Sequence, residues 1–128
     1  MKQHNAKPLC GFDDVKFGMT RTQVRAILGE PAREFKKSKF SKTMTDDYTS
    51  FHIFYDKNDE FEAVEFFDDV EIKVDGNIIF PASIEQLKAN YNFASDGDGY
   101  ICVEHSIGVY APGGKAESIL FAVSEYYV

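Results

Sequence analysis

Hydrophobic residues follow two kinds of pattern along the chain, with helical spacing in two short stretches and strict alternation in several others. In the first helical stretch, Thr20 is followed three residues later by Gln23, which predicts a capping box with Thr20 as the N-cap. Gly29 is typical of a left-handed C-cap, and Pro31 prevents the helix from continuing. The apolar positions between these signals fall on one helical face: Val24, Ile27 and Leu28.

A second helical stretch repeats this layout after Pro81. Ser83 and Gln86 form the same capping box, and Leu87 and Tyr91 occupy the apolar positions of the first helix. Asn92 stands in the place of the terminating glycine, and asparagine also adopts the left-handed conformation. Two helices with the same cap, apolar register and terminator indicate an internal duplication.

The alternating stretches predict hairpins that support the duplication. Strands are expected at 51–55 and 60–67 around the turn 56–59, and at 106–110 and 115–122, the last continuing to Tyr127. Both hairpins have a tyrosine before the turn, Tyr55 and Tyr110, followed by the pattern Glu-x-aliphatic-x-Phe. A third hairpin is expected over Val70–Phe80, because Asp75-Gly76 favours a tight turn between alternating residues.

The spacing between helix and hairpin is longer in the first unit, and the extra residues are the Lys- and Ser-rich segment Arg33–Lys42. We interpret this segment as a solvated loop, with a basic binding patch as the alternative. We therefore expect one domain over residues 1–128, with repeat units at about 12–80 and about 81–128. Its class is α+β, with each unit contributing one helix and an antiparallel sheet.

Composition narrows the functional classes. The chain has 128 residues, of which 44% are hydrophobic, and its 12 Phe and 7 Tyr favour strands. The net charge of -7 argues against a nucleic-acid binder, which needs clustered Lys and Arg. An acidic domain suits a basic protein partner, although the charge also serves solubility.

The chain contains no pattern of a secreted or membrane protein. The polar residues 1–8 lack the apolar run of a signal peptide, and no segment has the length of a membrane span. We expect a cytoplasmic location without membrane association. Cys10 and Cys102 are too few for a zinc site, and whether they pair is left open.

A catalytic set is not recognisable, so we predict that the chain is not an enzyme and needs no cofactor or metal. His52 and His105 fall in expected strands, and Cys102 in an apolar strand is typical of a buried, inert thiol. The segment Asp96–Gly99 is similar to the start of a calcium loop, but Ile107 stands where the closing Glu belongs. We interpret it as an acidic turn between helix and strand.

The best candidate site is an acidic cluster around the first hairpin, mixed with aromatic residues as in many protein interfaces. Its alternative is a sheet face made soluble by carboxylates. We expect Asp56 and Asp59, at the tip of the turn, to be the most exposed. The predicted partner-binding residues are Tyr55, Asp56, Asp59, Glu60, Glu62, Asp68, Asp69 and Tyr110.

One motif resembles a known family. Its residues are Gly18-Met19-Thr20, Gln23-Val24, Leu28-Gly29 and Pro31. They resemble the beta-lactamase inhibitor protein fold and its relatives, the small outer-membrane assembly lipoproteins of the SmpA/OmlA type. The resemblance implies two tandem helix-plus-sheet units whose sheets join into one curved sheet, with the helices on one face and a surface that grips a target protein.

The departures from the family change the expected role. Pro81-Ala82-Ser83 replaces Gly-Met-Thr in the second unit, and the inhibitor's local disulfides and the lipoproteins' leader and lipid-bearing cysteine have no counterpart. We therefore expect an inhibitor or immunity-type protein that covers a basic partner, for instance a bacterial toxin nuclease. The alternative is a structural or assembly module, or a homodimer, that uses an exposed edge such as a C-terminal strand ending at Val128.

Overall fold

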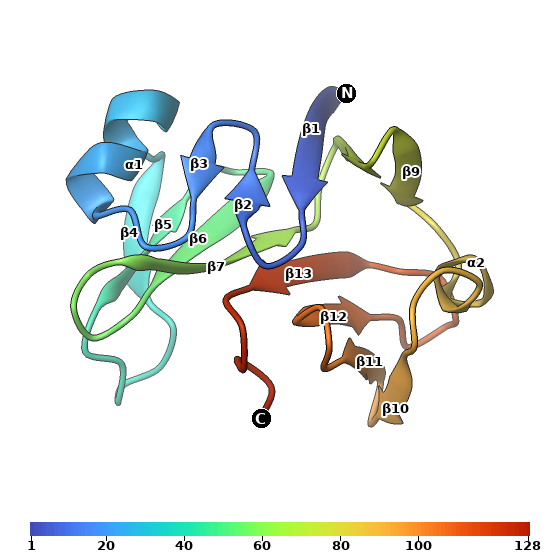
Figure 1. The fold of residues 1–128 in the computed structure, drawn as a ribbon. Coiled ribbons are helices and arrows are strands. Elements are labelled where there is room, and N and C mark those ends of the chain that lie inside the picture. The colour runs from blue at the N-terminus through green and yellow to red at the C-terminus, as the bar shows by residue number, and fades with distance from the viewer.

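An eight-stranded antiparallel sheet forms the main layer of the molecule (Figure 1). The computed structural model describes residues 1–128 and is mostly β, with 45% strand and 10% helix. The strands follow the order β10-β11-β12-β13-β7-β6-β5-β4. Their bounds are β4 Arg33–Lys36, β5 Met44–Asp47, β6 Phe51–Tyr55, β7 Phe61–Phe66, β10 Ala94–Asp96, β11 Gly99–Cys102, β12 Ile107–Tyr110 and β13 Ser118–Ala122.

A second sheet of five strands, in the order β3-β2-β1-β8-β9, lies beside the first. Its strands are β1 Lys2–Lys7, β2 Gly11–Phe12, β3 Val15–Lys16, β8 Val70–Val74 and β9 Asn77–Phe80. The hairpin β8–β9 turns at Asp75-Gly76 as predicted, but it pairs with β1 in parallel. The prediction that the sheets of the two units join into one is confirmed by the eight-stranded sheet, but the prediction that the fold has one sheet alone is wrong, because β8 and β9 pair with β1 in a second sheet.

The small sheet and both helices cover the same face of the large sheet. In Figure 1, β1, β2, β3 and the helix α1 (Arg21–Leu28) lie above β7 and β13, the helix α2 (Ile84–Lys88) lies at the right beside β13, and the chain ends below them. Phe12 of the small sheet makes edge contacts with Phe51 and Phe66 of the large one, at 5.5 and 5.2 Å between ring centroids. Val24 and Leu87 of the helices are buried in the same core.

The two halves of the large sheet, each with its helix, match in detail. We call α1 with β4–β7 the first unit and α2 with β10–β13 the second unit. Both predicted capping boxes are present, and each N-cap residue forms a β-bridge with a residue that follows the hairpin turn of its unit, Thr20 with Glu60 and Ser83 with Lys115. Each helix is thus fixed to the sheet by the same backbone connection in both units.

The last strands of the two units, β7 and β13, pair with each other and make the sheet continuous. Val64 lies opposite Phe121, and Phe66 lies opposite Ile119. In the Glu-x-aliphatic-x-Phe pattern, Val64 corresponds to Ile119 and Phe66 to Phe121, so equivalent residues exchange places across the pair. This exchange defines an approximate two-fold axis through the opposed pair between them, Glu65 and Leu120.

The prediction that Tyr55 and Tyr110 occupy equivalent positions is wrong, because Tyr110 is equivalent to Phe54, one residue earlier. Tyr55 pairs with Phe61 beyond a β-bulge, whereas Tyr110 pairs with Ser118, the equivalent of Ala63. A shift of one residue moves a strand side chain to the other face of the sheet. Tyr55 is consequently buried in the core, with 5% of its surface exposed, and Tyr110 is 47% exposed on the opposite face.

Some predicted boundaries also change. The first four residues of the expected loop Arg33–Lys42 form strand β4. The helix α2 ends at Lys88 with Ala89 in right-handed helical conformation, so Asn92 is not its cap. Ile27 is exposed, although it shares the apolar face of α1. The acidic turn Gly97-Asp98 joins two strands, β10 and β11, rather than a helix and a strand.

The C-terminal residues do not form the predicted strand. The strand β13 ends at Ala122 and lies inside the sheet between β12 and β7, so it has no free edge. The following residues turn back across the face opposite the helices (Figure 1). Neither helix is long and apolar enough to cross a membrane.

Candidate protein-binding face

The face of the large sheet opposite the helices, which we call the open face, carries one row of directly opposed residues across all eight strands. From β4 to β10 the row is Arg33, Asp47, His52, Glu65, Leu120, Gly108, Ile101 and Ala94. Directly paired residues lie on the same face of a sheet. The first four residues belong to the first unit and are polar, and the last four belong to the second unit and lack charge.

The polar half of the row is internally bonded. Arg33 Nε donates to Asp47 Oδ2 at 2.7 Å, and His52 Nε2 lies 3.5 Å from Asp47 Oδ1. Ser118 Oγ donates to Glu65 Oε2 at 2.8 Å. Burial lowers the pKa of His52, and the charges of Asp47 and Glu65 offset only part of this effect. The hydrogen bond from Arg33 lowers the pKa of Asp47 against the effect of its burial.

Two tyrosines from the C-terminal segment cover the middle of the open face. Tyr126 packs on Phe54, Ala63 and Ala122 and receives a 3.3 Å hydrogen bond from Lys37 Nζ. The hydroxyl of Tyr127 lies against Gly108, where an added Cβ would be 2.0 Å away. Glycine at this position of the row is therefore required for the tyrosine to dock.

On either side of the tyrosines the open face has a hollow, and the two hollows are equivalent in the two units. Phe54 and Thr45 line the first hollow, and their equivalents Tyr110 and Gly99 line the second. The loop between β4 and β5 borders the first, and the much shorter β10–β11 turn borders the second. These matched positions are uncharged, and the two hollows differ in the charged residues around them.

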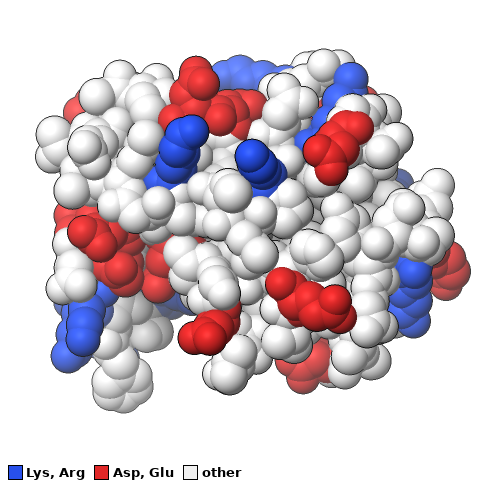
Figure 2. Space-filling model, viewed as in Figure 1, with Lys and Arg blue, Asp and Glu red and all other residues white.

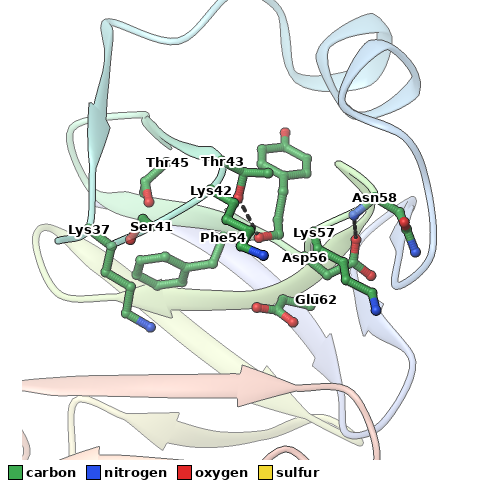
Figure 3. Close-up of a pocket in the computed structure, with 11 residues that line it drawn as sticks. Lys37, Ser41, Lys42, Thr43, Thr45, Phe54, Asp56, Lys57, Asn58 and Glu62 are labelled. Carbon is green, nitrogen blue, oxygen red and sulfur yellow. Dashed lines mark hydrogen bonds between the residues drawn. The ribbon is translucent and has the colours of Figure 1, made fainter. Parts of the chain in front are cut away.

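The first hollow is basic on balance and has a volume of about 470 Å³. Figure 3 shows Lys37, Lys42 and Lys57 around Phe54, with the carboxylates of Asp56 and Glu62 between them. Lys37 Nζ lies 4.7 Å from the centroid of the Phe54 ring.

The second hollow, which we call the acidic hollow, has a volume of about 430 Å³ and no Lys or Arg in its lining. Three carboxylates border it, and its other side chains are mainly apolar or aromatic. The carboxylates are Glu65, Asp96 and Asp98, and the apolar and aromatic lining includes Tyr100, Ile101, Tyr110, Leu120 and Tyr127. Asp96 and Asp98 are exposed and have no ion-pair partner within the chain. An aromatic surface with a carboxylate border is suited to an ammonium or guanidinium group.

Two of the predicted site residues, Tyr55 and Asp59, take part in a charged network centred on Asp46. Asp46 is fully buried and accepts hydrogen bonds from Arg21 at 2.7 Å, from Arg25 at 2.6 and 3.0 Å and from the hydroxyl of Tyr55 at 2.9 Å. Arg21 also holds Asp59 through two hydrogen bonds of 2.9 and 2.7 Å. Tyr55 and Asp59 therefore belong to a structural network that ties α1 to the sheet.

The pKa values in this network follow its charges. Burial tends to lower the pKa of Arg21, but hydrogen bonding to Asp59 and the charge of Asp46 raise it overall. The hydrogen bond from Arg21 lowers the pKa of Asp59. Burial and the charge of Asp46 raise the pKa of Tyr48 to about 12.

The second unit replaces this network with a weaker contact. Lys88 stands at the position of Arg25, and Tyr100 at that of Asp46. Lys88 Nζ lies 4.9 Å from the centroid of the Tyr100 ring, a cation–π geometry. The helices of both units thus place a cation over the same sheet position, with a carboxylate beneath it in the first unit only.

The remaining predicted site residues are scattered. Asp56 is half-buried and accepts hydrogen bonds from the backbone of Asn58 and Glu60. Asp56 and Asp59 are therefore not the most exposed residues of the turn, contrary to the prediction. Lys57 and Asn58 are more exposed. Glu62 lines the first hollow, where burial and Asp56 raise its pKa.

Asp68 and Asp69 are exposed at the turn between β7 and β8, away from both hollows, and Asp69 lies 3.9 Å from the N-terminal ammonium. Tyr110 is the one predicted site residue in the acidic hollow.

On the side drawn in Figure 2, acidic and basic side chains are interspersed without a large area of one sign. The overall negative charge therefore does not locate a site.

The cysteines and histidines form no second site. Both cysteines are free, and buried Cys102 Sγ lies 3.5 Å from Nδ1 of His105, which is in a turn rather than in the predicted strand.

No family model, curated protein or solved structure matches this chain.

Proposed function

We propose that this chain is a non-enzymatic protein-binding domain whose open face takes up a basic segment of another protein. The acidic hollow is the contact site, and Asp96 and Asp98 pair with lysine or arginine side chains of the partner. Ile101, Tyr110 and Leu120 contact the aliphatic parts of these side chains.

The observation that carries this proposal is the set of three carboxylates around an apolar hollow without a lysine or arginine. Ion pairs at an exposed site contribute little by themselves, so the apolar and aromatic surface must supply much of the binding free energy. The carboxylates then select a cationic segment and accelerate its association.

An inhibitor or immunity-type role is the form of this function that we favour. It is supported by the resemblance of Gly18-Met19-Thr20 and the following residues to the beta-lactamase inhibitor fold, whose sheet surface grips a target. The matched capping boxes, bridges and β7–β13 pairing support the internal duplication that this resemblance implies. We propose a cytoplasmic location, in which the chain covers a basic cleft such as that of a toxin nuclease.

The alternative role, as an assembly module or homodimer, needs a different surface from the one expected. The C-terminal strand has no free edge, because β13 lies between β12 and β7. Phe40, which is 82% exposed in the loop between β4 and β5, is a better candidate for such a contact.

The proposal is tested by capturing proteins from a lysate of the native host on the parent chain and on Asp96→Lys/Asp98→Lys. Asp68→Lys/Asp69→Lys is the matched control, with the same charge change on exposed aspartates away from the hollow. We expect a basic protein that is retained by the parent and the control, lost from the first variant, and released by salt. Equal retention by all three chains would contradict the proposed site.

A further inference from the structure

We infer that the acidic hollow also binds a second copy of this chain, through the loop between β4 and β5. The loop spans residues 37–43 and carries Lys37, Lys39 and Lys42 without an acidic residue. Phe40 lies between these lysines and is 82% exposed, whereas most aromatic side chains of the chain are buried or half-buried. An exposed aromatic ring among lysines has the chemistry that the hollow is proposed to bind.

The loop holds Phe40 in a defined position. The hydroxyl of Ser38 accepts a hydrogen bond from the backbone N–H of Phe40 at 3.2 Å. The backbone N–H of Ser38 donates to the hydroxyl of Ser41 at 3.0 Å, and the N–H of Ser41 donates to the carbonyl of Ser38 at 3.1 Å. Because these bonds order the loop before contact, less conformational entropy is lost when it binds.

The loop does not reach the hollow of its own chain. It follows β4, the edge strand at one end of the large sheet, and the hollow is bordered by the β10–β11 turn at the other end. Six strands separate these two edge strands. The occupant must therefore come from another molecule.

Charge and size match between two copies. Lys39 and Lys42 of one copy face Asp96 and Asp98 of the other, and the Phe40 ring enters the apolar part of the hollow. A volume of about 430 Å³ is within the range of sites that enclose small organic ligands, so it accommodates one aromatic side chain. Lys39 Nζ lies 5.1 Å from the Phe40 ring centroid, so cation and ring are presented together.

This contact joins two different surfaces, so the association is head-to-tail, and a pair of copies keeps one free loop and one free hollow to which further copies can add. It rests on the proposed function, because it uses the same acidic hollow. It also predicts that self-association and partner binding exclude each other. A free basic partner would therefore dissociate the assembled copies.

Complementary charge reversal tests the inference by sedimentation velocity over a range of concentrations at low salt. Lys39→Glu/Lys42→Glu makes the loop acidic, and Asp96→Lys/Asp98→Lys makes the hollow basic. We expect the mass of the parent chain to rise with concentration and each variant alone to remain monomeric. An equimolar mixture of the two variants should associate again, because each loop then meets a hollow of opposite charge.

Two further variants keep the test independent of folding. Phe40→Ser changes only an exposed side chain, and we expect it to raise the dissociation constant by about tenfold or more. Lys2→Glu/Lys7→Glu, on exposed positions of β1, is the charge-matched control and should associate like the parent.

A parent chain that stays monomeric, or variants that fail to associate when mixed, would overturn the inference. If the parent is monomeric but still captures a basic protein through Asp96 and Asp98, self-association is wrong and the proposed function stands. If the parent associates but no basic protein is captured, the acidic hollow serves self-association alone.

Discussion

Glu65 and Leu120 occupy equivalent positions in the two units and lie directly opposite each other in the centre of the large sheet. The approximate two-fold axis passes between them, and it separates the polar half of the row of opposed residues from the half without charge. The same scaffold position thus carries a carboxylate in one unit and an aliphatic side chain in the other. Both side chains line the acidic hollow, where Glu65 supplies a carboxylate and Leu120 supplies part of the apolar surface.

The buried carboxylate of Asp46 is predicted to be the most sensitive single position for stability. Asp46→Ala leaves Arg21 and Arg25 without their shared acceptor, and breaking a buried ion pair typically costs about 3–5 kcal/mol. Urea unfolding measures this cost. Asp68→Ala, at an exposed turn position without a positive φ, should change the free energy of unfolding by less than about 0.5 kcal/mol. Similar values for both variants would show that the network does not stabilise the fold.

The two tyrosines that precede the hairpin turns should behave differently. Tyr55→Phe removes a buried hydrogen bond to the charged Asp46 and should cost about 1.5–3 kcal/mol. Tyr110→Phe, on an exposed residue, should be nearly neutral in stability, whereas Tyr110→Ala should weaken partner capture. Thermal and urea unfolding of the two Phe variants check the first difference. Equal costs would contradict the one-residue shift between the hairpins.

Gly108 and Tyr127 should be energetically coupled. Gly108→Ala places a methyl group where the Tyr127 hydroxyl lies and should cost about 1–3 kcal/mol through overpacking. In a Tyr127→Ala background the same substitution should cost close to nothing, because the tyrosine is no longer displaced. A double-mutant cycle measured by urea unfolding gives the coupling free energy. Additive effects would mean that the C-terminal segment does not pack on the sheet.

The lowered pKa of His52 predicts a specific dependence of stability on pH. Burial holds this pKa below the ordinary value of 6.5. The charges of Asp47 and Glu65 raise it and the charge of Arg33 lowers it, but burial is the largest effect. As the pH falls through about 6.5, the unfolded chain binds a proton before the folded chain does, so the free energy of unfolding decreases. Above that pH both states are neutral and the contribution is complete.

His52→Phe should flatten this dependence between about pH 7 and the lower pKa of the folded state. The aromatic neighbours Phe35 and Phe67 accommodate the new ring. Asp47 also has a lowered pKa, but its contribution is lost only below its ordinary value of 3.8 and should persist in the variant. Unfolding curves at several pH values check this, and an unchanged slope in the variant would contradict it.

The sequence predicted the features of this fold that depend on neighbouring residues. Both capping boxes, the left-handed Gly29 and the Asp75-Gly76 turn follow from local conformational preferences. The strand Lys2–Lys7 was missed because only Ala6 is buried in it and its partner β8 is distant in sequence. Its role depends on tertiary pairing, which a local pattern does not contain.

The candidate site was predicted less well, for a related reason. Acidic residues close together in sequence suggested the first hairpin, but Asp59 is paired with Arg21 of α1 and the other predicted carboxylates do not gather at one site. The acidic hollow is assembled from separate strands, and of its residues only Tyr110 was predicted. The β-bulge between Phe54 and Tyr55 places Tyr55 in the core, whereas Tyr110 in the regular β12–β13 pair lies on the open face, and this difference leaves no signal in the spacing of the tyrosines.

The measurement that tests the central claim most directly is a titration of the ¹⁵N-labelled chain with the basic partner retained in the capture experiment, followed by NMR. We predict that the backbone signals of Glu65, Asp96, Ile101 and Tyr110 shift most, because these residues line the acidic hollow. Shifts concentrated at Asp56 and Asp59 of the first hairpin, with the hollow unchanged, would contradict this account.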